Sequence, residues 1–124
     1  MLVPPPPEFV PELMSDLNLF IHGDEPYLTP VIKAGLVHAQ LETIHPFLDG
    51  NDRVGRILIA LMLCSSGILS RPTLYPSLCL KVHRAHYYNL LQRVHTHDDW
   101  TAWLDFFLDG IAPQPKPPTQ HGPF

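Results

Sequence analysis

The stretch "DRVGRILIALMLCSSG" (residues 52–67) decides the fold class. From Ile57 to Leu63 nearly every position is apolar, so a helix formed here has apolar side chains on nearly every face. A helix that is apolar all round is typical of the buried centre of a domain. Gly67 provides a signal for the end of the helix. The pattern therefore predicts a central buried helix over about residues 52–66.

Helical patterns also lie on both sides of this stretch. In residues 7–22 the apolar side chains recur three and four positions apart, which is the spacing of a helix. Thr29 and Pro30 form a start signal for a second helix, which should end near His45 because the following proline disfavours helical geometry. Residues 77–97 predict one helix or two short ones, and residues 98–111 predict a last helix with an acidic start. No strong strand pattern is present, so the expected fold is all-α, a helical bundle around the 52–66 helix.

The composition is that of an ordinary folded domain. Of the 124 residues, 45% are hydrophobic and 16% are charged, and the formal net charge is -4, which gives no indication of nucleic-acid binding. The longest apolar run, residues 57–64, is too short to cross a bilayer, so no membrane partner is expected. The N-terminus lacks the pattern of a secretory signal. Cys64 and Cys79 read as buried free thiols, which predicts a cytoplasmic protein.

The prolines divide the chain. Fifteen are present, and they gather in "PPPP" (4–7) and "PQPKPP" (113–118). We therefore expect a Pro-rich N-terminal segment over 1–7, a globular domain over 8–112 and a Pro-rich tail over 113–124.

Residues 45–56, "HPFLDGNDRVGR", combine the parts of an anion site. A helix that begins at about Asn51 or Asp52 presents free amides and the positive end of its dipole. Gly50 lets the backbone approach a ligand closely, and Arg53 and Arg56 share one face of the same helix end. Together these features favour a polyphosphate ligand.

Two further side chains in this stretch indicate chemistry. The carboxylate of Asp49 is suited to hold Mg²⁺ beside a polyphosphate. A neutral imidazole at His45 can accept a proton from an attacking hydroxyl. Taken singly, each residue of the stretch is explained as well by helix capping or by surface ion pairs. Their combination in twelve positions favours catalysis or nucleotide binding, and the stretch is not a P-loop.

These residues resemble the motif of the Fic (filamentation induced by cAMP) family, His-Pro-Phe-x-[Asp/Glu]-Gly-Asn-Gly-Arg-x-x-Arg. The sequence departs from the motif only at Asp52, where the family has glycine. The stretches "HAQLETIHPF" (38–47), "YYNLLQRV" (87–94) and "DWTAWLDFFLDG" (99–110) are also similar to bacterial Fic proteins. The resemblance extends from about Val3 to Gly110.

The resemblance implies a protein that transfers AMP from ATP, with Mg²⁺, to a Ser, Thr or Tyr hydroxyl of a target protein. It implies the following roles: His45 as general base, Phe47 as an anchor of the loop in the core, Asp49 as the Mg²⁺ ligand, Gly50 and Asn51 in the anion hole, and Arg53 and Arg56 as contacts to the β- and γ-phosphates. It also implies an adenine pocket lined by Tyr87, Tyr88, Leu91 and His95, although core packing explains these positions about as well.

Two departures from the family pattern affect this expectation. The β-hairpin flap that should dock the target strand is largely missing, so the chain is expected to be truncated at its N-terminus. The [Ser/Thr]-x-x-x-Glu-[Gly/Asn] string of the inhibitory helix is also absent, so any such helix should come from missing sequence or another chain.

Asp52, at the glycine position of the motif, is a further departure, and its effect stays open at this point. At ~4 Å and an effective dielectric of ~20, its charge would oppose a bound phosphate by about 4 kcal/mol. It could instead join Asp49 as a second Mg²⁺ ligand. In Doc toxins a lysine stands here, and those proteins resemble kinases.

Three functions follow from the sequence. The first is a Fic-type AMP transferase whose activity Asp52, in place of the motif glycine, would weaken. The second is a silent Fic fold that binds a nucleotide or a protein without chemistry. The third is a transferase that uses another phosphate-containing donor.

Overall fold

The protein is described here by a computed structural model, which defines residues 4–69 and 78–111. Within these residues all regular structure is helical, which confirms the all-α prediction. The elements are listed in chain order: η1 (Pro7–Phe9), α1 (Val10–His22), α2 (Pro30–Ile44), α3 (Asn51–Ser65), α4 (Leu78–Val82), α5 (Arg84–His97) and α6 (Trp100–Ile111). The expected Pro-rich tail over 113–124 lies outside the described residues.

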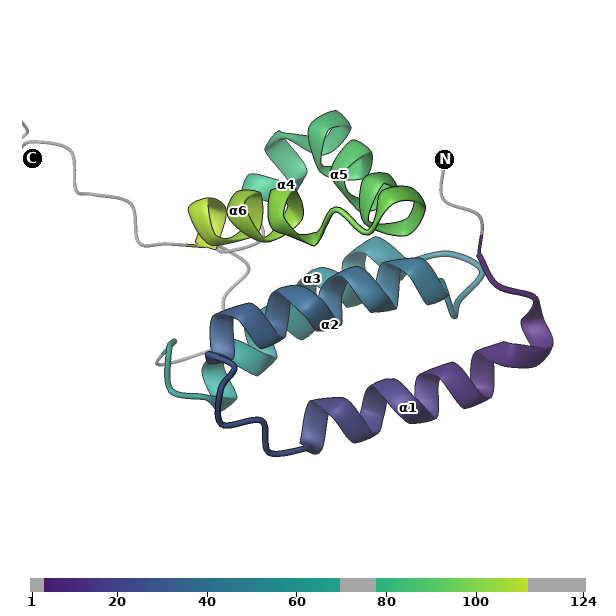
Figure 1. Cartoon of the computed structure of the whole chain (residues 1–124), viewed down its shortest axis with the longest axis horizontal. Helices are drawn as coiled ribbons and strands as arrows, with labels where there is room; N and C mark the ends of the chain where they lie inside the picture. The colour runs from purple at the N-terminus through teal and green to yellow at the C-terminus, as the bar shows by residue number, and fades with distance from the viewer. Residues whose placement is uncertain (1–3, 70–77, 112–124) are drawn as a thin grey trace, which may run out of the picture.

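The helices form three layers (Figure 1). α1 lies on one side, α2 and α3 lie side by side in the middle, and α4, α5 and α6 cover the other side. α2 packs against α1, α3, α5 and α6, so it is the helix around which the fold is built.

The predicted helix over 52–66 is confirmed and lies in the middle layer, but the expectation that it is buried on nearly every face is wrong. α3 occupies the expected residues, but Ile57 is 40% exposed and Leu61 is 49% exposed. α3 is covered on the side that faces α2, where Ile59, Ala60 and Leu63 are buried. Its apolar composition alone does not show which of its faces has a neighbour.

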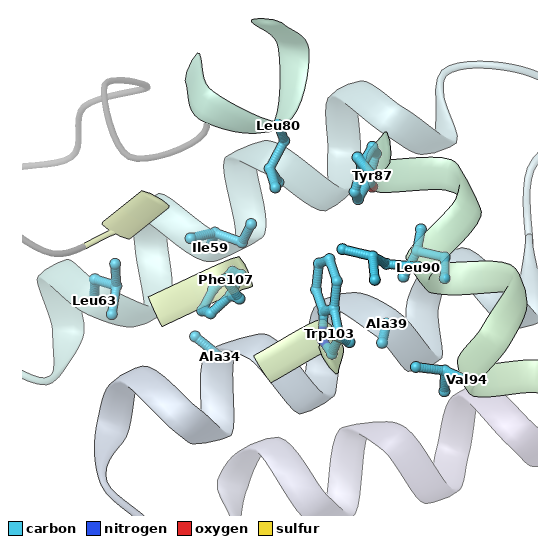
Figure 2. Packing of buried hydrophobic residues seen from close by; sticks show 11 residues of the cluster. Ala34, Ala39, Ile59, Leu63, Leu80, Tyr87, Leu90, Val94, Trp103 and Phe107 are labelled. Atoms are coloured by element: carbon cyan, nitrogen blue, oxygen red, sulfur yellow. The ribbon is translucent and has the colours of Figure 1, made fainter. Parts of the chain in front are cut away.

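Small residues in α2 allow the close approach of α6. A Cβ atom added to Gly35 would lie 2.9 Å from Cδ2 of Phe107, so the ring of Phe107 packs directly on the α2 backbone. Trp103 donates a hydrogen bond from Nε1 to the Gly35 carbonyl oxygen over 3.1 Å. Both aromatic side chains have no exposed surface, and Figure 2 shows them between α2, α3 and α5.

A second, smaller core joins α1 to α2. Its buried members are Leu17 from α1 and Val37, Leu41 and Ile44 from α2. Burial of a leucine or isoleucine side chain contributes about 1.5 to 3 kcal/mol, so this contact is sufficient to hold α1 against the middle layer.

The helix ends follow the local signals. The Thr29 hydroxyl accepts a hydrogen bond from the Ile32 amide over 3.2 Å, and Pro30 is the first residue of α2. α2 ends at Ile44 with His45 as its C-cap, as predicted. The 77–97 region contains two helices, α4 and α5.

No helix in the described part of the chain is long and apolar enough to cross a membrane. Cys64 carries a free thiol and is only partly buried, so the expectation of a fully buried thiol is wrong for this residue. The side chain of Cys79 lies outside what the structure describes.

Candidate functional site

A cleft of about 930 Å³ opens between the first turn of α3 and the helices α4 and α5. The turn between α2 and α3 also lines it, through His45, Asp49 and Gly50. The charged and polar residues that line the cleft are Glu42, Thr43, His45, Asp49, Asn51, Asp52, Arg53, Arg56, Lys81, Arg84, Tyr87, Tyr88, Asn89 and Gln92. The structure thus brings the residues of the 45–56 stretch together with residues of α4 and α5.

The N-terminus of α3 points its free amides toward the cleft. Gly50 is the N-cap with φ 82°, a left-handed conformation that glycine adopts without steric cost, and no side chain caps this helix end. The first hydrogen bond of the helix runs from the Val54 amide to the Gly50 carbonyl oxygen, so the amides before Val54 have no acceptor in the helix. This helix end attracts an anion.

Arg53 and Arg56 add two positive charges to the same helix end. Arg53 is exposed and Arg56 is partly buried, and both line the cleft. Neither arginine has an ion-pair partner among residues 4–69 and 78–111. Because no described carboxylate holds either guanidinium in an ion pair, both are well suited to a polyphosphate.

His45 connects α2 to the turn that lines the cleft. Its backbone is left-handed, with φ 54° and ψ 59°, and its amide donates a hydrogen bond to the Leu41 carbonyl oxygen over 2.9 Å. A left-handed conformation costs a residue other than glycine about 1 to 3 kcal/mol. This strained residue carries an exposed imidazole that lines the cleft. Strained backbone conformations of this kind are common at functional sites.

The side chain of Asn51 fixes the turn that carries His45 and Asp49. Its Oδ1 atom accepts a hydrogen bond from the Phe47 amide over 3.0 Å, and its Nδ2 atom donates one to the Phe47 carbonyl oxygen over 2.8 Å. Asn51 is only 3% exposed, so these bonds are protected from water. Its side chain therefore organises the turn, while its backbone amide belongs to the open helix end.

The expected role of Phe47 as a core anchor is wrong. The residue is 46% exposed, and it lines an apolar groove together with residues of α1 and α3. The backbone of Phe47, through its two bonds to Asn51, holds the turn in place.

Asp49 lies on the exposed part of the turn, at the edge of the cleft. It has no ion-pair partner in the part of the chain that the structure describes. The same part contains no group of three or more His, Cys, Asp and Glu side chains that could hold a metal ion. Magnesium is usually held by one or two carboxylates together with substrate phosphates, so a single carboxylate beside an anion site fits this ion.

Asp52 is directed toward α5. The Tyr88 hydroxyl donates a hydrogen bond to Oδ2 of Asp52, and Nη2 of Arg84 lies 3.7 Å from the same oxygen. The Arg84 guanidinium also lies over the Tyr88 ring, with 5.5 Å between its Cζ atom and the ring centroid. We call these three residues the Asp52 clamp, because they join the first turn of α3 to the first turns of α5 across the cleft.

Glu42 lies beneath this clamp as a buried acid. It is 3% exposed, and its Oε2 atom has no hydrogen-bond partner among the described residues. Burial, together with the neighbouring Asp52 carboxylate, raises the pKa of Glu42 to about 8. Glu42 is therefore a neutral acid at neutral pH, and its proton can be shared with Asp52.

The charge of Asp52 is compensated by these neighbours. Partial burial raises the pKa of this carboxyl, but the hydrogen bonds from Tyr88 and Glu42 and the charge of Arg84 outweigh it, so the pKa lies below its usual value. The Tyr88 hydroxyl remains neutral, because burial and the Asp52 carboxylate raise its pKa to about 12. Asp52 is thus an ionised carboxylate with three partners.

A buried histidine supports the other tyrosine of the cleft. Nδ1 of His38 lies 3.2 Å from the Gly55 carbonyl oxygen, and Nε2 lies 2.5 Å from the Tyr87 hydroxyl. Because a carbonyl oxygen can only accept, Nδ1 carries the proton and Tyr87 donates to Nε2. Burial lowers the pKa of His38 to about 4, so the ring is neutral, and it stacks on Trp103.

The expected adenine pocket divides into two parts. Tyr87 and Tyr88 line the cleft. Leu91 and His95 do not line it: Leu91 is 1% exposed in the main core, and His95 is exposed on the surface.

Arg84 and Glu42 are among the cleft residues that were not predicted from the sequence. Arg84 lies one helical turn before Tyr88, and Glu42 lies one turn before His45. Charged residues three or four positions from a predicted site residue on the same helix share its face, and this spacing could have identified both.

Known proteins are similar in sequence to the part of the chain that carries this site. A model of the Fic/DOC family matches residues 2–63, which include η1, α1, α2, the turn and most of α3. The chain belongs to the Fic/DOC family. The sequence expectation of a Fic domain is thereby confirmed, and the cleft lies where the matched Fic motif meets α5.

Curated relatives of this Fic chain are named as protein adenylyltransferases. It is 35% identical over 109 residues to the protein adenylyltransferase Fic of Culex quinquefasciatus, which covers 86% of this chain and 20% of the relative. It is 42% identical over 67 residues to a probable protein adenylyltransferase of Aquifex aeolicus, with 54% and 21% covered. A Caenorhabditis elegans protein adenylyltransferase is 38% identical over 88 residues, with 68% and 16% covered. The chain thus spans about a fifth of the length of these relatives.

Proposed function

We propose that this Fic domain transfers AMP from ATP to a Ser, Thr or Tyr hydroxyl of a target protein. The observation that carries the proposal is the cleft itself, which combines an exposed imidazole with an open helix N-terminus and two arginines that have no ion-pair partner in the described part of the chain. The names of the relatives support the same reaction.

The reaction follows from the placement of His45. The imidazole accepts the proton of the target hydroxyl as its oxygen forms a bond to the α-phosphorus of ATP. The bond between that phosphorus and the oxygen bridging to the β-phosphate breaks, and pyrophosphate leaves. The left-handed backbone at His45 and the Asn51 bonds to the turn hold the imidazole in position, which lowers the entropic part of the barrier.

The leaving pyrophosphate requires compensation of its negative charge. The free amides of the first turn of α3, together with Arg53 and Arg56, supply positive charge that is already oriented before the reaction. Asp49 would hold Mg²⁺ at the edge of the cleft. When bound, the ion would neutralise charge on the phosphates.

The test uses ATP and Mg²⁺ with lysate proteins and mass spectrometry of the products. The native protein should add one AMP to protein hydroxyls. His45→Asn is the matched variant, because asparagine tolerates the left-handed backbone but is not a base. It should retain ATP binding and lose transfer by about 10²-fold or more. Equal transfer by the native protein and by His45→Asn would overturn the role of His45.

Two other outcomes would support the two alternative functions considered from the sequence. Binding of ATP without any transfer by the native chain would favour a silent Fic module. Transfer of a phosphoryl group alone, seen as modification by phosphate and release of ADP, would favour a kinase-like reaction at the same cleft.

A further inference from the structure

The Asp52 clamp joins two walls of the cleft that are far apart in sequence. Asp52 belongs to the first turn of α3, whereas Arg84 and Tyr88 lie one turn apart on α5. The carboxylate accepts a hydrogen bond from the Tyr88 hydroxyl and lies 3.7 Å from the Arg84 guanidinium. The residue that replaces the motif glycine is therefore a structural link between the helix that binds phosphate and the helix that carries the two tyrosines.

The link also shapes the surface that the cleft presents. Arg84 lies over the Tyr88 ring at 5.5 Å, and the Tyr88 ring lies 5.0 Å from the Tyr87 ring. Tyr87 is held in place by the hydrogen bond between its hydroxyl and His38. Tyr87 is buried and its ring is tilted by 35° from that of Tyr88, so the exposed part of this surface is the Arg84 guanidinium with the partly exposed Tyr88 ring. A guanidinium on an aromatic ring is a surface of the kind on which a nucleobase stacks. Asp52 contacts both Tyr88 and Arg84.

We propose that Asp52 is a positioning residue for the nucleotide, which acts by holding Tyr88 and Arg84 in place as a stacking surface for the base. This inference rests on the proposed function, since it concerns the ATP of that reaction. It gives Asp52 a role that differs from the two considered from sequence alone. The carboxylate neither faces the phosphates unpaired nor needs Mg²⁺ as a partner, because Tyr88 and Arg84 already satisfy it.

The test compares a ligand that has a base with one that lacks it. The two probes are a non-hydrolysable ATP analogue and inorganic tripolyphosphate, each measured with Mg²⁺ by titration calorimetry. For Asp52→Gly, which restores the motif residue, the clamp predicts about tenfold weaker binding of the ATP analogue and unchanged binding of tripolyphosphate. Phosphate repulsion by Asp52 predicts the opposite, because both probes would bind more tightly to this variant.

Three further variants separate positioning from general damage. Asp52→Asn keeps an acceptor for the Tyr88 hydroxyl, so it should recover most of the affinity, to within about threefold of the native protein. Tyr88→Phe should weaken binding of the analogue, and the Asp52→Gly/Tyr88→Phe double variant should be no weaker than the worse single variant. In kinetic assays the variants should raise KM for ATP with little change in kcat.

The outcomes distinguish this inference from the proposed function. Native affinity for the ATP analogue in Asp52→Gly would overturn the positioning role, and so would tighter binding of both probes, while ATP binding by the native protein would leave the function intact. If the native protein, folded by circular dichroism, binds neither probe, the proposed function fails, and the inference fails with it. Thermal unfolding of each variant verifies that a lost affinity is not a lost fold.

Discussion

The Tyr87 hydroxyl on α5 donates a hydrogen bond of 2.5 Å to Nε2 of His38 on α2. Through this bond a tyrosine that lines the cleft is fixed by an imidazole that is 1% exposed. The same ring reaches α3 through the Gly55 carbonyl oxygen and α6 through its stack on Trp103. His38 therefore connects the site to the three helices that surround α2 on this side.

Replacement of Tyr87 by phenylalanine should destabilise the fold through this bond. The variant leaves Nε2 of His38 buried without a donor, which costs about 1 to 3 kcal/mol of the free energy of unfolding. Urea unfolding at pH 7.5 measures the loss. Tyr88→Phe is the matched control, because the Asp52 carboxylate that it leaves behind is 31% exposed and can bind water. Equal losses for the two variants would argue against a special role of His38.

Replacement of Glu42 by glutamine should change the pH dependence of stability. The folded protein retains a proton on Glu42 up to about pH 8, whereas the unfolded chain releases it near the usual value of 4.5. Stability from this group is therefore greatest below pH 4.5 and falls as the pH rises from about 4.5 to 8. Glutamine keeps a donor for Asp52 and does not titrate.

The expected result is that Glu42→Gln and the native protein have similar stability at pH 5. At pH 8 the variant should be more stable by about 1 to 3 kcal/mol. The comparison with the native protein at each pH removes the contribution of His38, whose lowered pKa makes stability rise between about pH 4 and 6.5. A constant difference from pH 5 to 8 would show that Glu42 is ionised in the folded state.

Replacement of Gly55 by alanine should separate α2 from α3. An added Cβ atom would lie 2.7 Å from Oε2 of Glu42 and 2.9 Å from Cε1 of His38, and both of these side chains are buried. The clash should exceed the gain of about 1 kcal/mol that alanine brings in a helix, so a net loss of about 1 to 2 kcal/mol is expected. Calorimetric unfolding measures it, and a stabilised variant would contradict the close packing.

Replacement of His45 by glycine should stabilise the protein although it removes the proposed base. Relief of the left-handed backbone is worth about 1 to 2 kcal/mol, and the greater flexibility of glycine in the unfolded chain offsets part of it. A net gain of about 0.5 to 1 kcal/mol in urea unfolding is expected. A loss of stability would mean that the imidazole makes stabilising contacts beyond those in the structure.

Local signals predicted the helices well, because caps and prolines act within one turn. Thr29 with Pro30 marked the start of α2, and the Asn51 start of α3 followed from the glycine before it. Which faces of α3 are exposed could not be predicted in this way. Ile57 and Leu61 are exposed because no described helix covers that side, and hydropathy does not encode the presence of a neighbour.

The candidate site shows the same division between local and distant information. The residues of the 45–56 stretch meet at the cleft because they belong to one turn and one helix end. The direction of Asp52 depends on Tyr88, which is 36 residues away in sequence, and no local pattern contains that contact. Leu91 was assigned to the adenine pocket by resemblance, but its side of α5 faces the core.

The central claim is that the cleft carries out AMP transfer with His45 as base. Its most direct test is incubation with ATP labelled either at the α-phosphate or at the γ-phosphate, followed by measurement of label on protein. The account predicts label from the α-phosphate only, with the native protein and not with His45→Asn. Label from the γ-phosphate, or equal α-label with both proteins, would contradict it.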